Sequence, residues 1–260
     1  MEHQIITGGT RVGSTAELRV IAATSTRLPM GPRPSDREDS RRRSRYLLIA
    51  HPRKGLVLVD SGVGPSMIPT RGRGLTPIGL LSPWDLLASI EVSPIHLTAA
   101  VVTGPEEDRL CNLARLPAGV PVFCDDRLRR KATSGGVVSR VSRNPAALLG
   151  RAEASLQSLH VLPRVSWLGV EGHDLFGDGS CLLIPLDDRP TGSLALLMPQ
   201  VERIAHPLVY LTRPDLQITA ENGRRALETM PPTIRRLMKL DCRVLHSADP
   251  APTEIDVIEI

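Results

Sequence analysis

The chain has 260 residues, 41% of them hydrophobic and 23% charged. This is enough to bury the core of one large domain and argues against disorder over the whole length. Aromatic residues make up only 2% of the chain, so surfaces on which bases could stack are scarce and we expect no nucleic-acid binding. The net charge is +4, and the densest basic cluster (Arg41, Arg42, Arg43 and Arg45) belongs to a Pro- and Arg-rich, loop-like stretch at about 27–44, which we interpret as a solvated loop.

The cysteines lie far apart and form no CxxC pair, which is typical of buried thiols in a reducing compartment. They are Cys111, Cys124, Cys181 and Cys242. No apolar run reaches about 18 residues, and the N-terminus lacks a charged segment followed by an apolar one. We therefore expect a cytoplasmic protein that does not bind membranes. A homodimer is the default expectation for its assembly.

In the first half, hydrophobic patterns separated by turn residues predict strands and two helices. A strand at 17–24 precedes the loop, and two apolar runs joined by Pro52-Arg53-Lys54 predict a hairpin at 46–51 and 55–60. Glycines and prolines indicate a loop at 64–80, after which Ser82-Pro83 begins a helix that ends near Ile90. The remaining expected elements are a strand at 95–102, a helix at 105–116 and a short strand at 120–123.

The second half begins with a basic segment at 126–158, which we interpret as an insertion with a helix at 145–159. Strands follow at 165–170, 181–186, 193–198 and 207–212. A helix at 219–240 is interrupted by Pro231-Pro232, and a last strand covers 243–246. Strand pairs that alternate with helices in two comparable halves predict a layered α/β sandwich.

Five segments resemble, in the right order, motifs of the metallo-β-lactamase superfamily and in particular of its lactonase-like small hydrolases. They are YLLIAHPRKGLVLVDSG, HLTAAVVTGPEEDRLCNLARLPAGVPVF, DLFGDGSCLLIPLDDRPTGSLALL, LVYLTRPD and LMKLDCRVLHSADP, within about residues 45–250. The resemblance implies a single domain over 1–260 with an αββα sandwich, in which two mixed sheets lie face to face and helices cover both outer faces. The segment at 126–158 is expected near the mouth of the site, and Asp60 is expected to stabilise the neighbouring loops.

The family binds its metals through a Thr-His-x-His-x-Asp-His turn, which matches Thr103 to Arg109 here. Gly104, Glu106 and Arg109 stand at the three histidine positions, and only Asp108 is kept. Glycine offers no side-chain donor and a guanidinium repels cations. This turn therefore lacks the imidazoles on which zinc binding depends.

The other metal-binding motifs are depleted as well. The fourth histidine position falls on Arg189, the bridging aspartate position falls on Pro214, and His246 matches the last histidine. Because zinc needs three or four converging donors, we expect no tightly bound metal and no other cofactor. We also expect no ordinary zinc-hydrolase activity. The alternative is a weak single metal ion between Asp108 and His246.

Two functional hypotheses remain open. In the first, the chain is a non-catalytic protein of this fold, and Arg109 and Arg189 take over the electrostatic role of the lost metals beside Glu106 and Asp188. These residues then either bind a small anionic molecule or form only a structural network of ion pairs.

In the second hypothesis the chain is an atypical hydrolase of a small ester, lactone or thioester. It would use a reduced metal site, or Asp108 and His246 as a metal-free base with its orienting carboxylate. No nucleophile motif such as GxSxG accompanies this pair, so the sequence does not decide between the two hypotheses.

Overall fold

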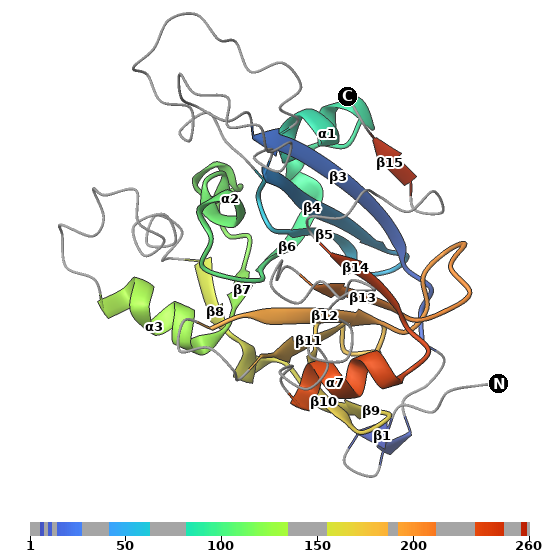
Figure 1. The fold of residues 1–260 in the computed structure, drawn as a ribbon. Coiled ribbons are helices and arrows are strands. Elements are labelled where there is room, and N and C mark those ends of the chain that lie inside the picture. The colour runs from blue at the N-terminus through green and yellow to red at the C-terminus, as the bar shows by residue number, and fades with distance from the viewer. Residues whose placement is uncertain are drawn as a thin grey trace, which may run out of the picture.

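The computed structural model describes residues 6–7, 10–11, 15–27, 42–62, 82–134, 155–186, 192–211, 232–246 and 256–258. These residues form two sheets that pack face to face (Figure 1). The first sheet has the order β15 (Asp256–Ile258), β3 (Arg19–Arg27), β4 (Arg42–His51), β5 (Gly55–Val59), β6 (Leu97–Val102), β7 (Val122–Cys124) and β8 (Leu156–Ser158).

The second sheet has the order β14 (Arg243–His246), β13 (Leu208–Leu211), β12 (Leu194–Met198), β11 (Leu182–Pro185), β10 (Val170–Asp174), β9 (Arg164–Trp167), β1 (Ile6–Thr7) and β2 (Thr10–Arg11). The helices are α1 (Pro83–Ser89), α2 (Glu107–Leu110), α3 (Asp126–Ser134) and α7 (Pro232–Lys239). Short 3-10 turns cover Pro94–His96, Leu113–Arg115 and Leu159–Val161. In the part of the chain that is described, no helix has the length and apolar character needed to cross a membrane.

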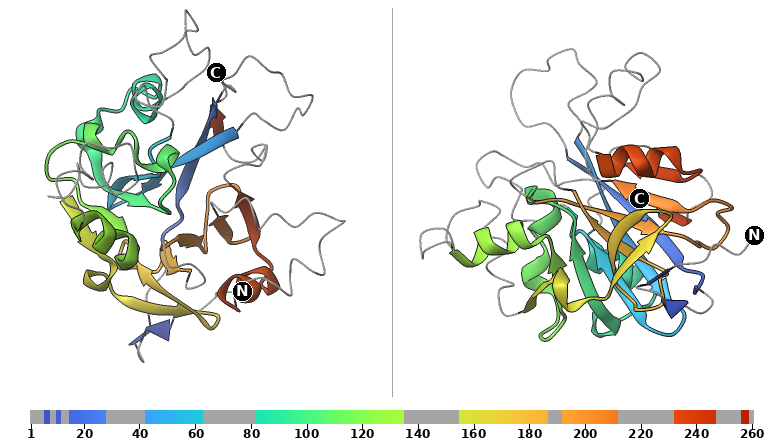
Figure 2. Two further views of the ribbon diagram at one scale, coloured as in Figure 1. Left: turned by 60° about the vertical axis from the view of Figure 1, so that its left-hand side comes forward. Right: turned by 90° about the horizontal axis from the view of Figure 1, so that it is seen from below.

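Strand alternation distributes the apolar side chains over three cores. In β4, Leu47 and Ile49 belong to the core between the sheets, whereas Tyr46 and Leu48 face outward to the cluster that includes α1. On the far side, Ile234 and Leu237 of α7 pack on the outer face of the second sheet. Figure 2 shows α7 in red on one side of the orange strands, with the blue and cyan strands beyond them. The expected αββα sandwich is therefore confirmed.

Helix α1 begins as predicted, because its first turn is capped. Asp85 N donates to Ser82 Oγ at 3.3 Å, and Asp85 Oδ2 accepts from Ser82 N at 2.9 Å. This capping box, with Pro83 in the first turn, satisfies amide groups that have no partner inside the helix. Trp84, Leu86 and Leu87 then enter the outer core.

The predicted helix at 105–116 is wrong in extent, because α2 ends at Leu110. Ser61 donates to Arg109 O from both its backbone N (3.0 Å) and its Oγ (2.8 Å). The Arg109 carbonyl is therefore bonded to Ser61 and not to an amide of a following helical turn. The chain continues instead into the 3-10 turn at Leu113–Arg115. A long-range contact thus ends the helix.

The predicted strand at 165–170 is also wrong, because it is two strands. β9 and β10 form an antiparallel hairpin whose two-residue turn is Leu168-Gly169, with φ values of 48° and 78°. Such turns usually carry Asn, Asp or Gly at the first position. Because Leu168 stands there, the sequence does not indicate a turn.

Three further predictions change at their ends. Of the helix predicted at 145–159, residues 156–158 form β8, which pairs in parallel with β7, and residues 145–154 lie outside the described part. The loop predicted at 27–44 is shorter, since β3 ends at Arg27 and β4 begins at Arg42. Of the helix at 219–240, the described part is α7, which begins after Pro231. The loop predicted at 64–80 lies outside the described residues.

At the edge of the sandwich formed by the β4–β5 turn, a buried histidine joins the two sheets. His51 Nε2 lies 2.8 Å from Asp178 Oδ2, while His51 Nδ1 accepts from the backbone N of Arg53 and of Lys54, each at 3.0 Å. Since Nδ1 accepts, the proton is on Nε2 and points at Asp178. Burial raises the pKa of Asp178, but hydrogen bonds from Ser180 and His51 outweigh it and the net pKa is lowered.

We expect Asp178→Ala to lower the free energy of unfolding by about 2 kcal/mol at pH 7, because it leaves the His51 N–H buried without its acceptor. A carboxyl whose folded pKa is lowered stabilises the fold above its unfolded pKa of about 4, and this contribution is lost as the pH falls through the folded value. The difference between wild type and variant in urea unfolding should therefore shrink toward pH 3. Asp241→Ala is the matched control, because it removes an Asp–His pair on the surface, with 94% of the Asp241 side chain exposed. Equal losses for the two variants would contradict the role of burial.

Candidate functional site: the turns after β5, β6 and β7

A buried carboxylate joins the ends of β5 and β6. These strands are parallel, so their carboxyl ends meet at one edge, where Asp60 follows β5 and Thr103 follows β6. Asp60 Oδ1 accepts from Thr103 N at 2.9 Å, and Asp60 Oδ2 accepts from Thr103 Oγ1 at 2.7 Å. Asp60 N donates to Val101 O at 2.8 Å. The loop-stabilising role that the resemblance implied for Asp60 is thus what these bonds perform.

Ser61 and Asn112 hold α2 against this edge. Asn112 donates from its backbone N to Ser61 Oγ (3.1 Å) and from Nδ2 to Ser61 O (2.6 Å). These two bonds and the two bonds from Ser61 to Arg109 O attach the end of α2 to the segment that follows β5. Arg109 therefore has a defined place on the scaffold.

The Arg109 guanidinium occupies the centre of the turn and is only 4% exposed. Its Nη1 lies 2.8 Å from Glu106 Oε2, as an ion pair without hydrogen-bond alignment, and donates to Thr103 Oγ1 at 3.3 Å. It also packs against Gly104, where an added Cβ would overlap the guanidinium and lie 2.5 Å from Glu106 Oε2. Arginine at 109 and a side chain at 104 therefore exclude one another in this arrangement.

The next strand along the edge contributes a second buried carboxylate. Asp125 follows β7 and accepts from Arg127 N, Nε and Nη2 at 2.8, 3.0 and 2.8 Å. Arg127 Nη2 also donates to Leu186 O, at 2.9 Å, at the end of β11. Gly192, with a φ of 79°, lies so close that a Cβ there would be 2.8 Å from Asp125 Cγ. These contacts fix both ends of the β11–β12 connection against β7.

The second sheet meets the same edge through β12. Leu194 N donates to Thr103 O at 2.8 Å, and β12 runs antiparallel to β13. β14 is parallel to β13 and pairs His246 with Leu211. The register thus brings the end of β14, and with it His246, to the edge where Thr103 lies.

The predicted site residues are therefore brought together in part. Arg109 and Glu106 form an ion pair, as one of the pairings expected from the sequence. Asp108 lies in α2 and His246 ends β14, but their side chains are outside what the structure describes, as are Asp188 and Arg189 altogether. The Asp108/His246 pair remains a prediction.

Arg45 belongs to this edge and was assigned wrongly from the sequence. We grouped it with a solvated basic loop, but its side chain is only 1% exposed. It alternates with Leu47 and Ile49, which places it on the face of β4 that meets the other sheet. Tyr210 Oη of β13 donates to Arg45 O at 3.0 Å. That alternation was the signal available in the sequence, and it was masked by the neighbouring arginines.

The Ser61 hydroxyl and the Cys111 thiol, which the sequence offered as groups near this turn, are bound to the backbone. Ser61 Oγ donates to Arg109 O, and Cys111 Sγ donates to Gly62 O at 2.8 Å. Burial, followed by the nearby Asp125, raises the pKa of Cys124 to about 12. None of these three groups is thus prepared as a nucleophile by a neighbouring base.

A zinc ion does not fit the described part of this turn. Within the described ranges, no three His, Cys, Asp or Glu side chains come together as metal ligands. The centre of the turn is instead filled by the Arg109 guanidinium, a permanent cation without a lone pair to donate.

Several solved structures have the same fold. An N-acyl homoserine lactone lactonase aligns over 90% of this chain and 92% of its own, with a TM-score of 0.55 and 14% identity. The chain has the metallo-β-lactamase fold. A putative metallo-β-lactamase from Thermotoga maritima aligns over 92% of this chain and 100% of its own, with a TM-score of 0.55 and 12% identity. The beta-lactamase superfamily hydrolase AbOPH aligns over 96% of this chain and 91% of its own, with a TM-score of 0.53 and 14% identity. No family model matches the sequence, and no curated protein matches it.

Within this metallo-β-lactamase-fold chain, we expect Gly104→Ala to lower the free energy of unfolding by about 1–3 kcal/mol, because the methyl group forces Arg109 and Glu106 out of place. In the double variant, Arg109→Ala removes the guanidinium that the new methyl group would overlap. Urea unfolding of wild type, both single variants and the double variant should give a coupling energy of about 0.5–3 kcal/mol. Additive losses would mean that the two positions do not compete for space.

Proposed function

We propose that this chain is a metallo-β-lactamase-fold protein that lacks ordinary zinc-hydrolase activity and binds a small anionic ligand at its former metal site. The observation that carries the proposal is the place of Arg109, whose buried guanidinium fills the centre of the turn and leaves no room for a side chain at Gly104. Imidazoles at this turn would donate lone pairs to a metal ion. The guanidinium instead offers a positive charge and N–H donors to an anion.

The charge of the turn supports an anion as the ligand. A guanidinium carries five N–H donors and matches carboxylates and phosphates in shape. Arg45 adds a second buried arginine at the same edge, and we include Arg189 as a third because it stands at a histidine position of the family motif. A site that has several arginines and few metal ligands selects anions.

The first test is the metal content of the full chain purified without chelator. We expect zinc, iron and manganese each at well below one ion per chain, and no hydrolysis of generic esters or lactones, because too few donors converge. The similar lactonase and hydrolase structures favour the alternative, an atypical hydrolase. About one metal per chain, lost together with activity in His246→Ala, would establish that alternative and reject our proposal.

The second test is thermal unfolding with phosphate, acetate and citrate at constant ionic strength. We expect one of these anions to raise Tm by about 3–6 °C at ten times its dissociation constant. Arg109→Lys keeps the charge but loses the planar fork, and Arg189→Ala loses the charge, so each should reduce the rise. Arg130→Ala, at an exposed position of α3, is the control that should retain it. A rise that is equal in all four proteins, or no rise with any anion, would reject an anion site here.

A further inference from the structure

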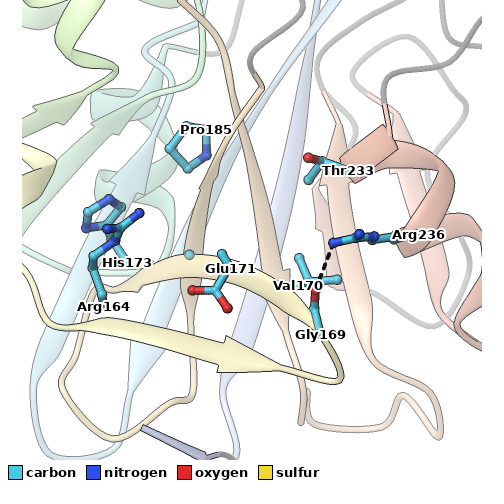
Figure 3. A pocket seen from close by; sticks show the side chains of 9 residues that line it. Arg164, Gly169, Val170, Glu171, His173, Pro185, Thr233 and Arg236 are labelled. Carbon is cyan, nitrogen blue, oxygen red and sulfur yellow. Dashed lines mark hydrogen bonds between the residues drawn. The ribbon is translucent and has the colours of Figure 1, made fainter. Parts of the chain in front are cut away.

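A second cavity lies away from the turns at Asp60, Thr103 and Asp125. It has a volume of about 260 Å³ and lies between the β9–β10 hairpin and helix α7 (Figure 3). Its side-chain walls are Arg164, Glu171, His173, Pro185, Thr233 and Arg236. It shares no residue with the former metal site.

The strand pattern explains why the cavity is open. Pairing of β10 with β11 is confined to His173↔Leu183 and Asp174↔Leu182. Pro185 lies farther along β11 and has no N–H to donate, so the ladder cannot extend past it on that side. Arg236 Nη1 donates to Gly169 O at 3.4 Å and ties α7 to the hairpin turn. The helix thus closes one side of a gap between strands.

Charged groups line the cavity on opposite sides. Figure 3 shows Arg236 and Thr233 on the α7 side, Arg164 beside His173 on the other, and Glu171 between them. Arg164 and Glu171 form no ion pair with any described residue, and Arg236 bonds only to Gly169 O. Two guanidiniums and one carboxylate therefore face a space large enough for a small molecule.

His173 adds a buried polar atom without a partner. Its side chain is 5% exposed, and within the described residues no group hydrogen-bonds to its Nδ1. Burial, opposed by a hydrogen bond with the backbone of Leu162, gives a net lowering of the pKa of His173. The ring is therefore neutral at pH 7, and it is held in the wall of the cavity without the partner that buried polar atoms normally have.

We propose that this cavity is a second ligand site, for a small amino-acid-like molecule. Its carboxylate binds one of the two guanidiniums that line opposite sides of the cavity, Arg164 or Arg236, because charge-assisted hydrogen bonds from a guanidinium are among the strongest that a carboxylate accepts. Its ammonium lies on Glu171, which is the acidic side chain among the described residues of the wall. A dianion without an ammonium would be repelled by Glu171, so the carboxylate of this residue sets the specificity.

The test is isothermal titration calorimetry of the full chain with L-glutamate, L-leucine, acetate and phosphate at constant ionic strength. We expect an amino acid to bind more tightly than acetate or phosphate. Arg164→Ala or Arg236→Ala, whichever removes the guanidinium that binds the carboxylate, should weaken its binding by about tenfold or more, because it removes a charge-assisted bond. Both arginines are exposed, so the fold is expected to survive, and circular dichroism checks this.

Glu171→Gln separates the proposed class from a general anion site. It should weaken amino-acid binding by about tenfold and strengthen phosphate binding, since it removes the negative charge. Arg189→Ala, which belongs to the former metal site, should leave amino-acid binding unchanged. Three results would each overturn the proposal. Amino-acid binding could be unchanged in both Arg164→Ala and Arg236→Ala, or phosphate could bind most tightly and with the same affinity in Glu171→Gln. The third result is that no probe binds with a dissociation constant below about 10 mM.

Discussion

The contact between the Arg109 guanidinium and Gly104 determines what this edge of the sandwich can do. A side chain at 104 and an arginine folded over it cannot occupy the same volume, so the two residues depend on each other. Glu106 and Thr103 hold the guanidinium in place, with Nη1 at 2.8 and 3.3 Å from their oxygens. The positive charge of this group is permanent, and it stands where a cation would have to bind. The chemistry of the edge follows from that one placement.

The scaffold around this contact is independent of the chemistry that it supports. Asp60 joins β5 to β6, Ser61 and Asn112 fix α2, and Leu194 ties the second sheet to Thr103. None of these bonds involves a histidine. The apolar core between the sheets likewise contains no histidine among its described buried residues and is made mainly of Leu and Val from both halves. The fold therefore does not depend on the residue types at the candidate site, because fold and site rest on different side chains.

Arginine side chains gather in two separate parts of the molecule. Near the former metal site the guanidinium of Arg109 is buried and ion-paired, and burial of such a pair contributes little net stability because desolvation offsets attraction. Beside α7, Arg164 and Arg236 are exposed and face a cavity. The two groups of arginines therefore differ in their surroundings, since one is paired inside the turn and the other lines an open space.

The sequence by itself determined the layers and the chemistry of the key turn. Two apolar runs at 46–51 and 55–60 predicted a hairpin, and Ser82-Pro83 predicted the start of α1. The residues from Thr103 to Arg109 lack the imidazoles of the motif that they resemble. These features are local, because strand alternation and capping act over a few residues. Only the tertiary structure decided which distant groups meet. Asp60 and Thr103 are 43 positions apart, and Tyr210 and Arg45 are 165 apart. The burial of Arg45, the early end of α2 and the pairing of β8 with β7 all follow from such long-range register, which no local pattern encodes.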